Sequence, residues 1–125
     1  MTVGDQGKAF YDAFVSAELA KKAGDDAEAE NLFRWGVSNG RQFLASIEKN
    51  VLSARESEKV PSAVILMTKG PSHDFVLGRM YEFAAAEATR MLPKREGGYG
   101  MWEEKERAAA KILLAERRPA AFGGK

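Results

Sequence analysis

Apolar residues recur every three or four positions along most of this 125-residue chain. Such spacing places them on one face of an α-helix, whereas a half-buried strand alternates at every second position. Glycine and proline interrupt the pattern at Gly24, at 70–72, at Pro93 and at 97–98. The pattern therefore predicts an all-α domain of four to five helices, packed as a bundle or orthogonally.

The first predicted helix covers residues 5–23 and has a broad apolar surface. Gly24 follows it, and glycine is favoured there because the residue after a helix often takes the left-handed conformation. Asp25 or Asp26 then caps the next helix. The inward side consists of two neighbouring stripes: Phe10, Phe14 and Ala17, with Tyr11, Val15 and Leu19 beside them.

The second predicted helix is long and extends to about residue 52. Gly36 and Gly40 lie within it, and two glycines four residues apart permit another helix to approach closely. The alternative is a turn at 38–40 that splits the helix, because Asn-Gly is a strong turn dipeptide. We favour the continuous helix, since its apolar seam is sustained over Phe33, Val37, Gly40, Leu44, Ile47 and Val51.

A polar, mobile-looking segment at 53–60 precedes a short apolar run at 63–67. The β-branched residues of that run also suit a strand, but the sequence offers no second strand with which it would pair. Pro61 before the run and Gly70 after it favour a two-turn buried helix.

Two further helices are predicted over residues 72–92 and 101–118. The inward stripe of the former is Leu77, Tyr81, Ala84, Ala88 and Met91, with Phe75, Met80 and Phe83 on its flanks. The inward residues of the latter are Trp102, Ala109, Ile112 and Leu113. We therefore expect one helical domain over residues 1–118 and a flexible tail over residues 119–125.

The stretch from Ala17 to Gly36 resembles one tetratricopeptide repeat. That family favours small residues, a Gly-Asp turn, alanine and an aromatic at the positions of Ala17, Gly24, Asp25, Ala29, Phe33 and Gly36. The resemblance covers about twenty residues, and no second copy of about 34 residues follows. It implies that the first two helices pack as a helix–turn–helix, and no function is carried over from it.

Composition excludes several kinds of chemistry. The chain has no cysteine, which excludes disulfides, thiolate metal sites and cysteine nucleophiles. One histidine leaves no room for a histidine-rich metal site, and no phosphate-binding glycine motif is present. We therefore predict neither a cofactor nor a metal site.

No apolar run approaches the roughly 20 residues that span a bilayer, so no membrane association is predicted. The first residues do not resemble a signal peptide. The expected location is cytoplasmic, although a mature secreted domain that has lost its leader would look the same.

Charge is unevenly distributed, although the net charge is only +1. Residues 1–30 carry seven acidic and three basic side chains, and residues 107–125 carry five basic and one acidic side chain. We expect these two ends to attract each other or to be solvated. The alternative is an acidic partner that binds the basic end.

The main candidate for recognition is the stretch 94–102, where two basic residues precede two aromatic ones: Lys94, Arg95, Tyr99 and Trp102. Such a loop presents an anchor to a protein partner or stacks a base of single-stranded nucleic acid. The simpler interpretation is a connector whose aromatic residues fold back onto the core. The candidate partner surface also includes Arg107, Lys111 and Trp35.

A weaker candidate site surrounds His73, the single histidine. A histidine beside the carboxylate of Asp74 can act as a base, and Arg41 and Arg79 are the cations considered with this pair. A ligand pocket or an enzyme requires all four residues to converge on one cavity. The simpler interpretation is a solvated helix start.

Taken together, these patterns predict a small non-enzymatic protein-interaction module of adaptor or inhibitor type, with a bacterial or phage origin and an unidentified protein partner. A homodimer suits the glycine-containing seam as well as a monomer does. Nucleic-acid binding is less favoured, because the net charge is close to zero. It would use Lys94, Arg95, Arg107, Lys111, Arg117 and Arg118. A ligand pocket or enzyme near His73 is the third hypothesis.

Overall fold

The computed structural model describes residues 1–95 and 97–123, and of Tyr99 it describes the backbone alone. Within these residues the chain forms six α-helices and one 3-10 helix and has no strand, which confirms the predicted all-α fold. The elements are α1 (Val3–Lys22), α2 (Asp26–Lys49), α3 (Ala54–Ser57), α4 (Ser62–Leu66), α5 (His73–Met91), α6 (Tyr99–Arg117) and η1 (Ala120–Phe122).

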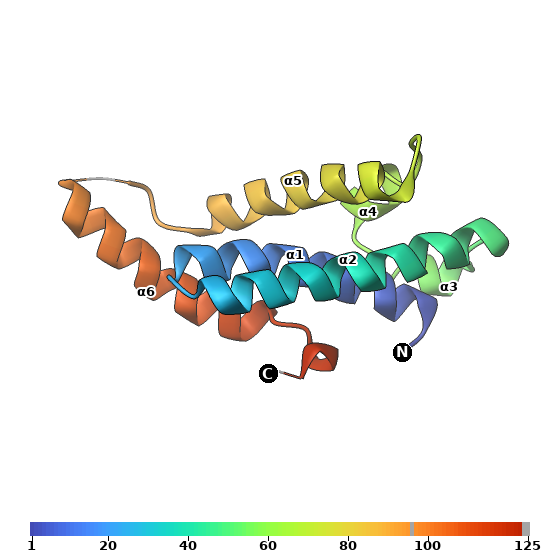
Figure 1. Ribbon diagram of the computed structural model, residues 1–125, viewed down its shortest axis with the longest axis horizontal. Helices are drawn as coiled ribbons and strands as arrows, with labels where there is room; N and C mark the ends of the chain where they lie inside the picture. The colour runs from blue at the N-terminus through green and yellow to red at the C-terminus, as the bar shows by residue number, and fades with distance from the viewer. Residues whose placement is uncertain (96, 124–125) are drawn as a thin grey trace.

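Helix α1 is the centre of the domain (Figure 1). Helix α2 runs antiparallel beside it, α5 lies along one side, and α6 packs against it from the other side. Because α1 has neighbours on several sides, it buries residues around most of its circumference rather than along one stripe. All six inward residues predicted for this helix are buried.

The turn between α1 and α2 is built as the sequence predicts. Gly24 has a φ of 87°, in the left-handed region that glycine tolerates best. The Asp25 side chain accepts a hydrogen bond from the backbone N–H of Glu28 at 3.0 Å and so caps α2. The segment that resembles a tetratricopeptide repeat is therefore a helix–turn–helix.

Helix α2 is continuous through the Asn-Gly dipeptide, and its glycines permit close helix contacts. A Cβ atom placed on Gly36 would lie 2.7 Å from the Phe14 ring of α1. One placed on Gly40 would lie 2.5 Å from the Leu77 side chain of α5. Neither position has room for a larger residue, which confirms the close approach inferred from the glycine spacing.

The predicted seam of α2 is confirmed only in its central part. Gly40 and Leu44 are buried, and Val37 and Ile47 are half-buried. At its ends, Phe33 is 41% exposed although its ring contacts Phe14 and Tyr81, and Val51 lies beyond the helix and is 96% exposed. The residues that α2 buries are Ala29, Leu32, Gly36, Gly40, Phe43 and Leu44.

The predicted inward stripe of α5 is largely confirmed, because Leu77, Ala84 and Ala88 are buried and Tyr81 and Met91 are half-buried; the flanks of that stripe and one inward residue of α6 differ. Phe75 and Phe83 are 52% and 46% exposed, and Ile112 is 64% exposed, although it was expected to face inward. Helix α5 buries Val76, Leu77, Met80, Ala84 and Ala88. Trp102, Ala109 and Leu113 are half-buried, whereas the fully buried positions of α6 are Glu106, Ala110 and Leu114.

The segment 53–60 is ordered by polar contacts, in contrast to the mobile linker expected from its composition. A carboxylate oxygen of Glu56 accepts a hydrogen bond from the backbone N–H of Gly4 at 2.8 Å. Lys59 lies 2.9 Å from Glu56 and 3.6 Å from Asp5. Helix α3 therefore clasps the N-terminal end of α1. The apolar run that follows is helical, as favoured, and forms α4, but this helix is shorter than the predicted two turns and buries only Val64, while Leu66 is 83% exposed.

The chain after α6 also differs from the predicted flexible tail. Pro119 is buried, residues 120–122 form η1, and the Phe122 ring meets the Trp35 ring edge-on at 6.0 Å between centroids. Trp35 of α2 is thus an apolar partner for Phe122, for which the sequence alone indicated no contact. The last two residues of the predicted tail, 124 and 125, lie outside the described residues.

Candidate functional site

The aromatic-basic stretch contacts its own domain rather than extending into solvent. The Arg95 guanidinium lies over the Trp102 ring at 4.5 Å, a cation–π arrangement. The same guanidinium donates to the carboxylate of Glu106 at 3.1 Å, and Glu106 is buried. Lys94 is exposed, and the side chain of Tyr99 lies outside the described part of the chain. For Arg95 and Trp102 the geometry matches the simpler interpretation, a connector folded onto α6.

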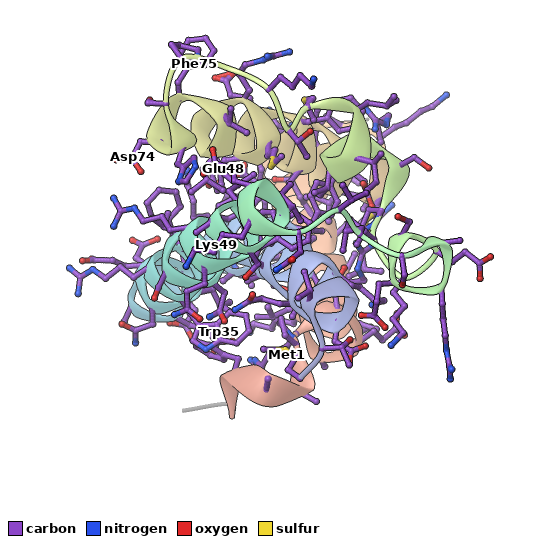
Figure 2. All side chains as sticks on the ribbon, turned by 90° about the vertical axis from the view of Figure 1, so that its right-hand side faces the viewer. Met1, Trp35, Glu48, Lys49, Asp74 and Phe75 are labelled. Atoms are coloured by element: carbon purple, nitrogen blue, oxygen red, sulfur yellow. The ribbon has the colours of Figure 1, made fainter. Side chains whose placement is uncertain are left out.

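The other residues of the predicted partner surface are spread over two helices. Arg107 lies 4.0 Å from Glu103, one turn earlier on α6, and Lys111 is exposed on the same helix. Trp35 is half-buried on α2, where its ring contacts Phe122 (Figure 2). The structure therefore does not gather these residues into one aromatic-basic surface.

The two C-terminal arginines of the predicted nucleic-acid surface are paired with carboxylates, two of which, Asp12 and Glu28, lie in the acidic N-terminal part of the chain. Arg117 donates to Asp12 at 3.1 Å and to Glu87 at 3.2 Å, and Arg118 donates to Glu28 at 2.7 Å. The basic end and the acidic end of the chain thus attract each other, as the charge distribution suggests. These pairings leave both arginines less available for phosphate.

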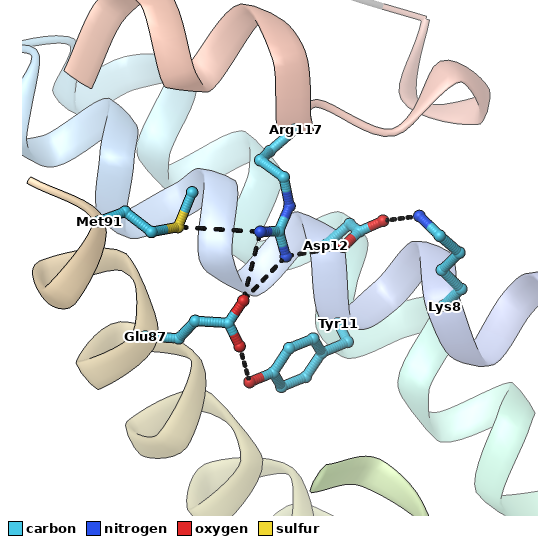
Figure 3. A network of polar contacts seen from close by, with 6 residues as sticks. All are labelled: Lys8, Tyr11, Asp12, Glu87, Met91 and Arg117. Carbon is cyan, nitrogen blue, oxygen red and sulfur yellow. Dashed lines mark hydrogen bonds and ion pairs between the residues drawn. The ribbon is translucent and has the colours of Figure 1, made fainter. Parts of the chain in front are cut away.

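Arg117 is the centre of a polar network that joins three helices (Figure 3). It bridges Asp12 of α1 and Glu87 of α5, while Glu87 accepts a hydrogen bond from the Tyr11 hydroxyl at 2.9 Å. Burial and the Glu87 carboxylate raise the pKa of Tyr11, so this hydroxyl remains a donor. Every polar group of the network has a partner within the domain, which gives it a structural role. Sequence spacing gave no signal for it beyond the opposite charges of the two ends.

The four residues considered around the histidine converge only in part. His73 Nε2 lies 2.9 Å from a carboxylate oxygen of Glu48. Arg41 donates to both oxygens of Asp74, at 2.9 and 3.1 Å, and this hydrogen bonding lowers the pKa of Asp74. Asp74 therefore holds an arginine rather than orienting the histidine as a base.

Two grooves adjoin this cluster. One of about 240 Å³ lies between α2 and α5, where Phe33, Val37 and Leu77 line it together with Arg41 and Asp74. The other, of about 740 Å³, lies along the exposed face of α5, and both Asp74 and Arg79 line it. The cations thus face different grooves, and no single cavity collects the set that an enzyme requires.

The larger of these two grooves has mainly apolar walls. Phe75 points away from α1 and α2 at the start of α5 (Figure 2). Phe83 lies two turns further along, and Met67 closes the groove from the end of α4. We call this surface the α5 groove; on α5 it comprises Asp74, Phe75, Gly78, Arg79, Glu82, Phe83 and Ala86.

The sequence analysis placed the two phenylalanines of the α5 groove on the flanks of a buried stripe and so missed the surface. The sequence signal for this surface is the position of its residues along the helix. Residues 75, 79, 82, 83 and 86 share a helical face that is rotated away from the buried residues of α5. An apolar stripe beyond the one that the core uses indicates a second contact surface.

Among the described residues, no three His, Asp or Glu side chains come together in an arrangement that holds a metal ion. No helix in the described part of the chain has both the length and the hydropathy to cross a bilayer. The cytoplasmic location stays a prediction.

Comparison of the chain with protein-family models, with curated proteins and with solved structures gave no match. The functional argument therefore rests on the all-α architecture and on the surface chemistry described above.

Proposed function

We propose that this protein is a small, non-enzymatic protein-interaction module of adaptor or inhibitor type, and that it binds a helix of its partner in the α5 groove. The observation that carries the proposal is the exposure of two large aromatic side chains on one helical face, with 52% of Phe75 and 46% of Phe83 open to solvent. Exposed apolar side chains that line one groove together with polar residues are typical of interaction sites.

The shape of the α5 groove favours a helix as its ligand. The groove follows the length of α5, and its lining residues recur at helical spacing. An amphipathic helix placed in such a groove anchors itself by side chains three, four and seven residues apart. Arg79 and Glu82 lie between the two phenylalanines, so the partner helix needs a complementary charge pattern between its apolar anchors.

This assignment moves the binding surface from the stretch 94–102 to α5. Arg95 and Trp102 already contact each other and Glu106, whereas the phenylalanines of the α5 groove turn their rings to solvent. Aromatic anchors contribute most when binding desolvates them, and Phe75 and Phe83 are open to that change.

The test is retention of proteins from a lysate on the immobilised chain, with three variants compared with the parent. We expect the double variant Phe75→Ser/Phe83→Ser to lose the retained protein. A control variant, Ile112→Ser, removes an even more exposed apolar residue from α6 and should still bind the retained protein. The circular dichroism spectra of the variants should match that of the parent, because exposed positions contribute little to stability.

The third variant, Trp102→Ala, tests the stretch 94–102. Loss of the retained protein in this variant alone, with the fold intact, would assign binding to that stretch and overturn the α5 proposal. Equal loss in the double variant and in the Ile112→Ser control would also contradict it.

A further inference from the structure

The exposed face of α5 complements itself when a second α5 runs antiparallel to it. Consider a two-fold axis that passes between residues 80 and 81. Residue 75 then lies level with residue 86 of the other copy, residue 78 with residue 83, and residue 79 with residue 82. These six positions are six of the seven α5 residues that line the α5 groove, the seventh being Asp74, and all six are exposed. Both helices would therefore contribute the same surface, as a two-fold interface requires.

Large and small residues alternate suitably in this arrangement. A Cβ atom placed on Gly78 would meet nothing within 4 Å, so the backbone at this position is open to an approaching helix. Phe75 lies level with Ala86, another small residue. Helices approach closely where large side chains of one meet small residues of the other.

The charges of the α5 groove select this orientation and register. Arg79 lies level with Glu82 of the other copy, and the two-fold axis forms this opposite-charge pair twice. A parallel pair in register would place Arg79 beside Arg79. An antiparallel pair centred on residue 79 would do the same. Like charges in contact disfavour both alternatives, as they do in coiled coils.

We propose that the helix bound in the α5 groove is α5 of a second copy of this chain, in the antiparallel register that pairs Arg79 with Glu82. This inference rests on the proposed function, because it names the partner of the same surface. One helix from each copy makes a small interface, at the lower end of the range for specific complexes. We therefore expect a dissociation constant of micromolar order.

The experiment is sedimentation equilibrium of the full chain from about 1 to about 500 µM, which brackets that affinity. The parent chain should pass from monomer to dimer. Arg79→Glu leaves two acidic residues at the paired positions, and Glu82→Arg leaves two basic ones. Each variant alone should dimerise at least about tenfold more weakly.

The two charge variants together supply the decisive result. When Arg79→Glu is mixed with Glu82→Arg, opposite charges meet again, and a heterodimer should form with parent-like affinity. Lys111→Glu, an exposed charge change on α6, is the matched control and should dimerise like the parent. Circular dichroism of each variant checks that the fold is intact.

Each outcome bears on one proposal or on both. A parent chain that stays monomeric over the whole range overturns the second-copy inference. In that case the proposed function still stands if the parent chain retains a protein from the lysate that Phe75→Ser/Phe83→Ser loses. If the double variant loses no retained protein, the proposed function fails as well. A dimer that neither charge variant weakens, or single variants that do not recover on mixing, overturns the proposed register.

Discussion

Replacing Gly36 by alanine tests the close packing of α1 and α2. The new Cβ atom would lie 2.7 and 2.8 Å from two atoms of the Phe14 ring and 3.3 Å from the backbone oxygen of Phe10. The Phe14 ring is completely buried and contacts the rings of Phe10, Phe33 and Tyr81, so it has little freedom to move aside. We therefore expect the substitution to overpack the core.

The size of the effect follows from two opposing contributions. Overpacking a well-packed core costs about 1–3 kcal/mol, and two contacts below 3 Å with an immobile ring favour the upper half of that range. Alanine in place of glycine inside a helix gains about 1 kcal/mol. The net expectation is that Gly36→Ala lowers the free energy of unfolding by about 1–2 kcal/mol, or Tm by roughly 3–8 °C.

The assay is urea unfolding followed by circular dichroism, at a concentration at which the chain is monomeric. The matched control is Gly78→Ala, because a Cβ atom at that position of α5 meets nothing within 4 Å. Only the helix-propensity gain remains there, so the control should be more stable by up to about 1 kcal/mol. A Gly36→Ala variant as stable as the parent would refute the reasoning, since the helices would then have room that the structure does not provide.

Three further predictions concern the polar and C-terminal contacts. Replacing Arg117 by alanine should cost about 1–3 kcal/mol, because it removes the bridge between Asp12 and Glu87 and leaves the half-buried Glu87 with only the Tyr11 hydroxyl. A double-mutant cycle with Glu87→Gln should give a coupling well above zero, and additive effects would contradict the bridge. Hydrogen bonds from Thr2, Lys59 and Gly4 lower the pKa of Glu56 to about 2 from 4.5. The stabilisation from Glu56 is therefore complete above about pH 4.5 and is lost as the pH falls towards 2. The difference in Tm between the parent and Glu56→Gln should shrink over that pH range. A constant difference would exclude the contact of Glu56 with the N-terminal end of α1. Finally, Phe122→Ala should shift tryptophan emission to longer wavelength by exposing Trp35, and an unchanged spectrum would show that η1 does not cover that ring in solution.

The sequence by itself determined where the helices begin and end. Local signals suffice for that purpose: Gly24 permits the left-handed turn, Ser72 caps α5 by accepting from the backbone N–H of Phe75, and Pro93 follows its C-terminal end. Helical periodicity also gave the all-α fold. The spacing of Gly36 and Gly40 correctly indicated close helix packing, because only a small residue leaves room for a neighbouring side chain.

The sequence also predicted the inward residues of α1, but only the tertiary structure decided how far the buried face of α2 and α6 extends. Periodicity fixes the spacing of apolar residues but not the direction from which a neighbouring helix approaches. Ile112 therefore lies in solvent while Ala110 and Leu114, on either side of it in sequence, are buried. The exposed face of α5 can be identified only from the structure, because the structure shows which residues on the other face of this helix the core buries.

The tertiary structure also decided which residues form the long-range contacts. Arg117 and Asp12 are 105 positions apart, and the uneven distribution of charge predicted attraction between the two ends without selecting the partners. The clasp of Glu56 on Gly4 and the ring contact of Phe122 with Trp35 likewise join segments that are distant in sequence. Such pairs form because helix packing brings the segments together, and no local pattern of residues encodes that proximity.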